Sequence, residues 1–188
     1  TRPSTYIDLS LGELRSINVT FVGNVKMPGV YALQPFSNII TGLIQAGGVD
    51  TTGSLRRIEI KRSGSVKASV DLYDYLIKGD LASNIQLRDQ DIVLVKPRTS
   101  LIKIDSAVVN QMIYEAIPGE TVYDLIQYAG GLKYNASEIV GIRKIKPKKE
   151  QKSGISYKAY YENIENTKNI LVDNGDHISV SYLFDELH

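Results

Sequence analysis

The stretch TVYDLIQYAGG, residues 121–131, decides the fold, because nearly the same phrase already stands at residues 38–48 as NIITGLIQAGG. Gly131 follows Gly48 by 83 positions, and the prolines that precede the two phrases keep the same interval, so the passages run in register without a gap. A repeat of this kind is the sequence sign of a duplicated structural unit. The chain is therefore predicted to hold two similar domains.

The composition is that of a globular protein with room for two small cores. The chain has 188 residues, of which 43% are hydrophobic, and this fraction is ample for packed interiors. Its 22 basic and 21 acidic residues leave a net charge of +1, which disfavours nucleic acid as a partner. It has no cysteine and therefore no disulfides. Because it opens TRPSTYIDLSL without Met, we expect it to be part of a longer protein.

Each copy is predicted to begin with a β-hairpin followed by a helix. Residues 17–25, INVTFVGNV, alternate apolar and polar side chains as a half-buried strand does, and residues 30–33 resume as a second strand. Pro28 and Gly29 are expected at the turn between them. The period then changes to that of a helix in both copies, with apolar residues at i, i+4 and i+7: Ile39, Leu43 and Ala46, then Val122, Ile126 and Ala129.

Hydroxyl side chains are predicted to cap both helices at their N-termini. Ser37 stands at this place in the first copy and Thr121 in the second, and a hydroxyl there accepts from the free amides of the first turn. Asp124, three residues after Thr121, is expected to complete a capping box.

The second half of each copy is predicted to be another hairpin and a closing strand. LRRIEIKR and VKASVDL flank the turn residues SGS, YDYLIKGD forms a short helical turn, and LRDQDIVLV closes the unit. The second copy closes with VDNGDHISV, where Asp176 follows Asp91 by 85 positions, so two residues have been inserted. The order indicates an α+β fold of two β-grasp domains, each a mixed sheet of four or five strands packed on one main helix.

The domain boundaries are predicted from this order. Residues 1–16, with the alternating Ile7, Leu9 and Leu11, are assigned to an N-terminal strand or extension from a preceding module. Residues 17–97 form the first domain and residues 98–188 the second. The linker KPRTS, residues 96–100, is too short for free independence of the domains, so a stiff tandem is expected.

The first copy closely resembles the SLBB domain, a β-grasp module described as binding soluble ligands. The residues that carry the resemblance extend over nearly all of residues 17–97: Gly23, Pro28, Gly29, Ala46, Gly47, Gly48, Gly53, Ser54, Leu55, Arg56, Asp71, Leu72, Gly79, Asp89 and Asp91. The second copy is a more divergent member, which keeps Ala129, Gly130, Gly131 and Asp176. It has Ser106 where the first has Gly23, and Gln111 and Met112 replace the Pro-Gly pair.

Tandem SLBB domains are similar to the periplasmic part of outer-membrane polysaccharide export proteins. The resemblance implies a non-catalytic role in capsule or exopolysaccharide secretion, through assembly into a homo-oligomeric ring and weak contact with a polysaccharide, acidic polymers included. It also implies partners in the inner-membrane export machinery. Two alternatives stay open: a module that binds or senses a small soluble ligand in an apolar pocket, and a structural adaptor whose exposed sheet edges pair with partner chains.

Two recurring motifs have structural interpretations beside functional ones. The double glycines, at 47–48 and 130–131, fit the positive φ needed just after a helix; the second glycine of each pair could also let a ligand or neighbouring subunit approach the backbone. The loops LRDQD and VDNGD could suggest calcium, but they lack the spacing of a calcium-binding loop. Turns fixed by carboxylate-to-backbone hydrogen bonds are expected there, and no metal is predicted.

Tyrosines and basic residues are the candidate ligand or interface residues. The chain has 12 Tyr and no Trp, and Tyr offers a flat face and a hydroxyl to a sugar or a subunit; the alternative is that these residues border the core. The run RKIKPKKEQK, residues 143–152, suits either a solvated hairpin tip or contact with an acidic polymer or lipid phosphate. The candidates are Tyr73, Tyr75, Tyr123, Tyr128 and Tyr134 together with Arg56, Arg57, Arg62, Lys146, Lys148 and Lys149; Lys61 adds to the milder basic patch of the first copy.

Catalysis has little support in the sequence. His177 and His188 are the only histidines, and His177 is expected on the closing strand in an exposed position. Without Cys or a nucleophile motif such as G-x-S-x-G, nucleophilic catalysis is unsupported. A non-enzyme without a cofactor is predicted.

Overall fold

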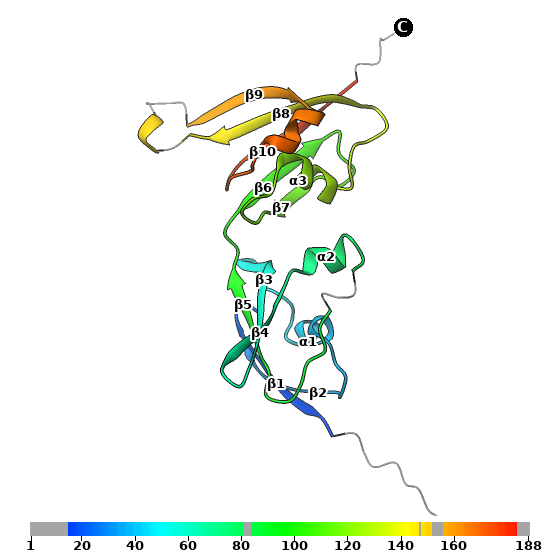
Figure 1. Ribbon diagram of the computed structural model, residues 1–188, viewed down its shortest axis with the longest axis vertical. Coiled ribbons are helices and arrows are strands. Elements are labelled where there is room, and N and C mark those ends of the chain that lie inside the picture. Colours follow the sequence, from blue (N-terminus) through cyan, green and yellow to red (C-terminus); the bar gives the residue numbers. More distant parts are fainter. Residues whose placement is uncertain (1–14, 81–83, 147, 152–155, 184–188) are drawn as a thin grey trace, which may run out of the picture.

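The computed structural model describes residues 15–80, 84–146, 148–151 and 156–183, and it contains two five-stranded mixed sheets. The expected strand at Ile7, Leu9 and Leu11 lies outside these residues. The two sheets follow one another along the long axis of the molecule (Figure 1). This architecture confirms the prediction of two consecutive α+β domains.

The first sheet takes its strands from residues 17–97. The elements are β1 (Ile17–Gly23), β2 (Gly29–Leu33), α1 (Ile39–Gln45), β3 (Gly53–Arg62), β4 (Ser65–Val70), α2 (Leu72–Leu76) and β5 (Ile92–Pro97). The strand order is β2-β1-β5-β3-β4, with β1 and β5 parallel and the other pairs antiparallel.

The second sheet repeats this order with the strands that follow the linker. Its elements are β6 (Leu101–Ser106), β7 (Met112–Glu115), α3 (Val122–Tyr128), β8 (Ala136–Ile145), the 3-10 helix η2 (Lys148–Glu150), β9 (Tyr157–Asn163), the 3-10 helix η3 (Ile164–Asn169) and β10 (His177–Tyr182). The order β7-β6-β10-β8-β9, with β6 and β10 parallel, matches the first sheet strand for strand.

Each sheet buries one face against its main helix. Alternate residues of the central strands, such as Phe21 on β1 and Ile60 on β3, pack under α1 in the first core. Gly42 allows α1 to approach the sheet closely, because a Cβ there would lie 2.5 Å from the ring of Phe21. In the second core Ile104 and Ile142 pack under α3. Within the described residues, no helix covers the opposite face of either sheet.

The helix caps confirm one prediction and correct another. Thr121 caps α3 and forms the expected box with Asp124. The cap of α1 is Asn38 and not Ser37: the Asn38 side chain accepts from the Thr41 amide at 2.9 Å, and the Thr41 hydroxyl accepts from the Asn38 amide. The offset of the repeat pairs Thr121 with Asn38, so α1 begins one residue later than the choice of Ser37 assumed.

Both residues of each glycine pair take positive φ. The values are 77° and 86° for Gly47 and Gly48, and 81° and 79° for Gly130 and Gly131. The amide of Gly48 donates to the carbonyl of Leu43 at 2.8 Å, which closes the end of α1. The backbone therefore explains both glycines, and the approach of a ligand at the second one stays a prediction.

The two aspartate loops are turns held by carboxylates, as predicted. Asp91 accepts from the amide of Arg88 at 2.8 Å and from the guanidinium of Arg62 at 2.6 and 2.7 Å. Asp176 likewise accepts from the amide of Asp173 at 2.9 Å, and Lys144 lies 3.1 Å from it. Both carboxylates are buried.

The described part of the chain contains no cluster of three or more metal-ligating side chains, and the absence of a metal stays a prediction. Its helices are all too short or too polar to cross a membrane.

Candidate functional site at the domain junction

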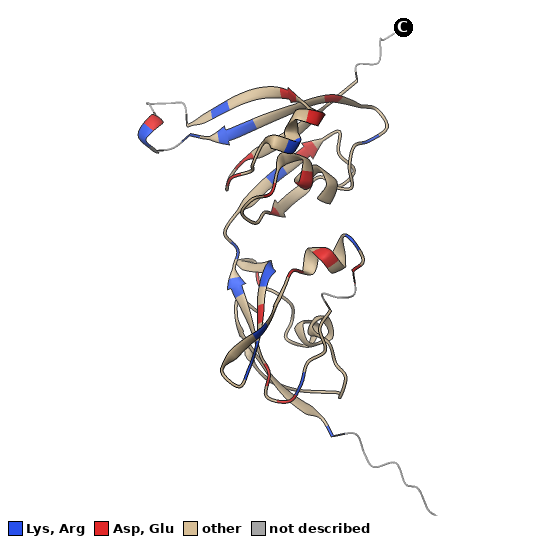
Figure 2. Cartoon of the chain, viewed as in Figure 1, with Lys and Arg blue, Asp and Glu red and all other residues tan. Residues whose placement is uncertain are grey.

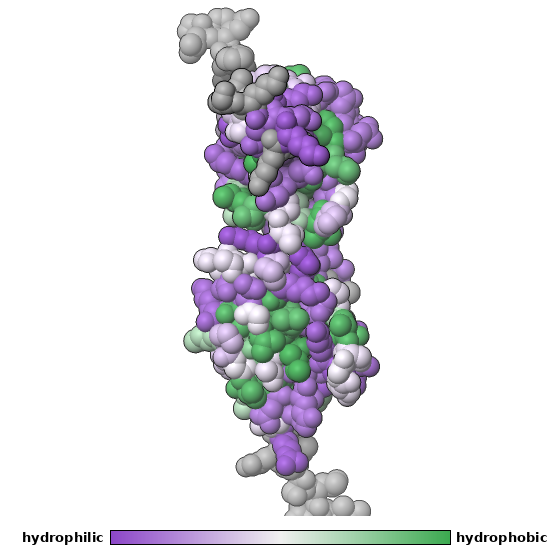
Figure 3. All heavy atoms as spheres, turned by 90° about the vertical axis from the view of Figure 1, so that its left-hand side faces the viewer, coloured by the Kyte–Doolittle hydropathy of each residue, from purple (hydrophilic) through white to green (hydrophobic). Residues whose placement is uncertain are grey.

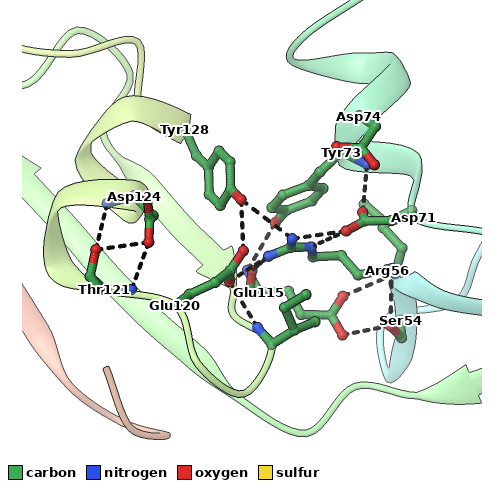
Figure 4. Close-up of polar contacts among 12 residues, drawn as sticks. Ser54, Arg56, Asp71, Tyr73, Asp74, Glu115, Glu120, Thr121, Asp124 and Tyr128 are labelled. Atoms are coloured by element: carbon green, nitrogen blue, oxygen red, sulfur yellow. Dashed lines mark hydrogen bonds and ion pairs between the residues drawn. The ribbon is translucent and has the colours of Figure 1, made fainter. Parts of the chain in front are cut away.

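Arg56 is the centre of a polar cluster between the two domains. It stands on β3, and only 6% of its surface is exposed. Its Nε and Nη2 donate to Oδ2 of Asp71, the residue that caps α2, at 2.9 and 2.8 Å. Its Nη1 donates to Oε2 of Glu120 in the second domain at 2.6 Å. One guanidinium therefore binds carboxylates of both domains (Figure 4).

Glu120 is held in place by its own domain. It immediately precedes the cap of α3, and its Oε2 accepts from the amide of Ile117 at 2.9 Å. Its other oxygen accepts from the hydroxyl of Tyr128, on α3, at 2.6 Å. With these contacts the carboxylate points toward Arg56 (Figure 4), so residues of the second domain fix its orientation.

Glu115 at the end of β7 forms the second polar link across the junction. The hydroxyl of Ser54 and the amide of Leu55 donate to its two carboxylate oxygens at 2.5 and 3.0 Å. Its backbone amide donates to the hydroxyl of Tyr73, on α2, at 2.8 Å, and its carbonyl accepts from Arg56. Glu115 is 5% exposed and Glu120 is 9% exposed. A buried carboxylate is stable only when such partners replace water.

Two tyrosines, one from each domain, enclose the guanidinium. The Arg56 Cζ lies 4.6 Å from the ring centroid of Tyr73 and 5.1 Å from that of Tyr128, within the range of cation–π attraction. The two rings meet edge to face, with their centroids 5.6 Å apart. Burial raises the pKa of Tyr73, and burial together with the hydrogen bond to Glu120 raises the pKa of Tyr128 to about 12. Both phenols are therefore neutral at ordinary pH.

The charge on Arg56 is secured by its partners. Burial by itself would lower the pKa of Arg56. The hydrogen bonds to Glu120 and Asp71 outweigh this effect, so the pKa of Arg56 lies above its ordinary value. Because every charge in the cluster has a hydrogen-bonded partner, the junction can be dry and still stable. We call this cluster the clamp, because its contacts can fix the angle between the two domains. Its members are Arg56, Asp71, Glu115, Glu120, Tyr73 and Tyr128.

An apolar cavity of about 470 Å³ lies beside the clamp. It is bounded by α2 of the first domain and by β7 and α3 of the second, and its lining residues are Leu55, Tyr73, Leu76, Ile77, Asn110, Met112, Ile113, Tyr114 and Tyr128. Tyr73 and Tyr128 thus belong to both the clamp and the cavity. A concave apolar surface with a few polar groups at its edge is the usual form of a small-molecule site.

Comparison with known families accounts for the repeated architecture. Residues 18–95 match one model of the SLBB domain and residues 107–155 match another, and the two matches together cover more than half of the chain. The chain belongs to the SLBB domain family. It holds two SLBB domains in tandem, as its sequence predicted.

Two curated relatives extend the comparison to a longer protein. Both bear the name polysialic acid transport protein KpsD of Escherichia coli, and each is 30% identical to this chain over 177 residues. The aligned part is 92% of this chain and 29% of the relative. The SLBB pair therefore spans less than a third of the proteins that it matches.

The SLBB junction gathers three of the predicted ligand or interface residues, Arg56, Tyr73 and Tyr128. The others lie apart from it. Arg62 pairs with Asp91, and Arg57 lies on the face of the first sheet that α1 does not cover. Tyr75 is half-buried on α2, Tyr123 lies 4.9 Å from the ammonium of Lys168, and Tyr134 is fully exposed.

The basic residues Lys146, Lys148 and Lys149 lie between β8 and β9 in the second SLBB domain, as expected for a hairpin connection. Figure 2 shows Lys and Arg along β8 and in this connection. Their contact with a ligand stays a prediction.

Sequence reasoning missed the two glutamates that complete the clamp. Glu115 stands at the end of a strand and Glu120 just before a helix cap, and neither position shows a local pattern that distinguishes it from a solvated carboxylate. A signal does exist in the repeat, because the offset of 83 places Ala32 and Ser37 at the equivalent positions of the first domain. Acidic residues that appear in only one copy indicate a role outside the shared fold.

Proposed function

We propose that this pair of SLBB domains is a non-catalytic part of a polysaccharide export protein, located in the periplasm and associated with the outer membrane through the rest of that protein. The observation that carries the proposal is the similarity to the polysialic acid transport proteins, because it covers 92% of the chain and therefore both domains. The buried clamp supports it, since a passage for a polymer needs rigid walls.

The export role is tested in cells that lack the gene of the full-length protein. A copy without the SLBB pair is expected to leave little polysaccharide at the surface, although the polymer is still made. A copy with both domains restores surface polysaccharide, which is measured by staining and by chemical assay of the washed cells. Surface polysaccharide that stays at the restored level without the two domains would contradict the proposal.

Ring assembly is a further part of the proposal. It is supported by the face of the first sheet that α1 leaves uncovered, where Val22, Val30, Ile92 and Leu94 lie on adjacent strands. Val30 is 68% exposed, and Figure 3 shows apolar atoms gathered on this side of the first domain. An exposed apolar surface of this kind favours association, here with a second copy of the protein.

Assembly is tested by the mass of the full-length protein in detergent, measured by light scattering. We expect an oligomer, and Val30→Asp is expected to lower the mass, because a carboxylate would be buried in the contact between copies. Ile44→Asp is the control, since Ile44 is also exposed but lies on α1, on the other side of the sheet. A monomeric wild-type protein would rule out the ring.

A second candidate function is the binding of a small soluble ligand, favoured by the apolar cavity of about 470 Å³ at the junction. An apolar ligand there would quench or enhance the emission of Tyr73, Tyr114 and Tyr128. Screening of small apolar metabolites by Tyr fluorescence tests this function, with Ile113→Asp as the variant that places a charge in the apolar lining of the cavity. If a ligand changes the Tyr fluorescence of Ile113→Asp as much as that of the wild-type chain, it binds elsewhere. The cavity then no longer supports this function.

A further inference from the structure

The open face of the second sheet carries a polar hollow that is separate from the junction. Its volume is about 220 Å³, and its lining residues come from β8, β9 and β10. The polar and aromatic side chains of the lining include Arg143, Tyr161, His177 and Ser179. Because α3 packs on the other face of this sheet, the hollow is open to solvent.

Arg143 brings a positive charge that no described carboxylate neutralises. Its Nη2 donates to Nδ1 of His177 at 2.9 Å, and its Cζ lies 5.2 Å from the ring centroid of Tyr157. Among the residues that the structure describes, no Asp or Glu forms an ion pair with it. A guanidinium has five N–H donors in a planar fork, so most of them remain available to an anion.

His177 and Asp105 hold this arginine in place. Since arginine can only donate, Nδ1 of His177 accepts, and Nε2 carries the proton that it donates to Oδ2 of Asp105 at 2.8 Å. Lys103 lies 3.1 Å from the same carboxylate oxygen. Lys103 thus balances the charge of Asp105 inside the network, and the charge of Arg143 is left for a ligand.

The fold does not require these polar residues, as the first domain shows. The parallel pair β1–β5 places Val22 beside Leu94, whereas β6–β10 places Asp105 beside Ser179. His177 takes the place of Ile92, and Arg143 takes the place of Lys61, which pairs with Ile92 as Arg143 pairs with His177. On this face β1 and β5 therefore carry Val22, Ile92 and Leu94, at the positions where β6 and β10 carry Asp105, His177 and Ser179.

Tyr161 supplies a flat apolar surface at the side of the hollow. Its ring lies over Gly141, where a Cβ would be 3.2 Å from Cε1, and the side chain is 74% exposed. An exposed aromatic ring offers its face to the C–H side of a sugar ring. The hydroxyl of Ser179, 3.0 Å from that of Ser106, is available as a hydrogen-bonding group beside it.

We propose that this hollow binds one carboxylate-bearing sugar residue of the exported polymer, with the carboxylate on Arg143 and the sugar ring against Tyr161. The inference rests on the proposed function, because it assumes a polysaccharide as the ligand. A forked guanidinium matches a carboxylate with two parallel hydrogen bonds. The hollow is shallow and open, so binding is weak, and a long chain can move past it.

The test is an NMR titration of the 188-residue chain with a sialic acid oligomer, the sugar in the name of the two relatives. Its carboxyl-reduced form and inorganic phosphate are titrated in parallel. We expect amide shifts at Gly141, Arg143, His177 and Ser179, with a Kd on the order of millimolar. Arg143→Gln is expected to weaken binding by at least about tenfold, and the reduced oligomer to bind as weakly as that variant does to the acid.

Two further variants test the position of the binding site and the contact with the sugar ring. Lys61→Gln, at the equivalent position of the first sheet, is expected to leave the affinity unchanged, and Tyr161→Ala is expected to weaken binding of both the acid and its reduced form. Equal affinity for the acid and the reduced oligomer, or no loss with Arg143→Gln, would overturn the inference. So would phosphate, if it produced the same shifts at the same concentration, because the hollow would then be a general anion site.

Failure of this inference is distinguishable from failure of the proposed function. If no sugar binds but surface polysaccharide still depends on the two SLBB domains, the hollow is not the contact and the export role stands. If export continues without the domains, the proposed function fails whatever the titration shows.

Discussion

Arg56 shows how one buried side chain can join two domains. Its carboxylate partners, Asp71 and Glu120, come from different domains, and two tyrosine rings exclude water from the guanidinium. Removing one member of a buried ionic cluster leaves the others charged and without partners, which destabilises a protein more than the cluster itself stabilises it. The residue is therefore a sensitive point for mutation.

Replacement of Arg56 by Met is expected to lower the free energy of unfolding by about 3 kcal/mol, because Asp71 and Glu120 lose their counterion in a buried site. Urea unfolding followed by circular dichroism measures this change. Arg57→Met is the control: the neighbouring side chain lies on the open face of the sheet, and its loss should change stability by less than about 0.5 kcal/mol. Equal effects of the two variants would mean that the clamp contributes little.

The raised pKa of Tyr128, about 12, predicts a loss of stability in alkali. In the unfolded chain a Tyr loses its proton near about pH 10, whereas the folded protein keeps the Tyr128 proton until a higher pH. The stabilisation is therefore fully present below about pH 10 and is lost as the pH rises toward about 12.

Urea unfolding at about pH 9 and about pH 11 tests this sign, with Tyr128→Phe as the comparison. The wild-type chain is expected to lose more stability between the two pH values than the variant, which has no proton to lose at this position. An equal decline in both chains would assign the alkaline loss to other groups.

At the scale of the element, the same local devices recur in both SLBB domains. Each main helix has a capping box and ends in two glycines at positive φ, and each closing strand follows a turn held by a buried aspartate. The base that pairs with the aspartate also recurs, as Arg62 in one domain and Lys144 in the other. The second copy has therefore kept the capping box, the glycine pair and the aspartate turn, although the rest of its sequence has diverged.

Loss of either helix cap is expected to lower stability by about 1 kcal/mol. The variants are Asn38→Ala and Thr121→Ala, because each side chain satisfies an amide of the first helical turn. Ser37→Ala is the matched control, since Asn38 and not Ser37 caps α1. Thermal unfolding by calorimetry measures all three, and a loss with Ser37→Ala as large as that with Asn38→Ala would contradict the observed cap.

At the scale of the whole molecule, the short linker and the clamp act together. Only residues 98–100 separate β5 from β6, and the contacts of Arg56 and Glu115 cross from one domain to the other beside it. Interfaces within a chain permit relative motion of domains unless strong contacts prevent it. The buried clamp supplies such contacts, so the tandem is expected to tumble as one body.

This rigidity is tested by the NMR relaxation of backbone amides, which reports rotational motion for each domain. In the wild-type chain the two domains are expected to have the same correlation time. The double variant Glu115→Gln/Glu120→Gln is expected to shorten it in both, because the charged contacts across the junction are lost. Glu165→Gln, which removes an exposed carboxylate on η3, should change nothing; different times in the wild-type chain would show that the clamp does not hold.

By itself, the sequence determined the duplication, the order of strands and helices, the cap of α3 and the family. These features depend on periodicity and on neighbours close in the chain, and the repeat shows the order of strands and helices twice. The choice of Ser37 failed for a local reason, a helix start shifted by one residue.

Only the tertiary structure decided the partners of Arg56 and the polar hollow around Arg143. The clamp depends on the angle at which two domains meet, and the hollow on which strands lie side by side. Neither is encoded in any short segment, because the residues that touch are 64 and 34 positions apart in the chain.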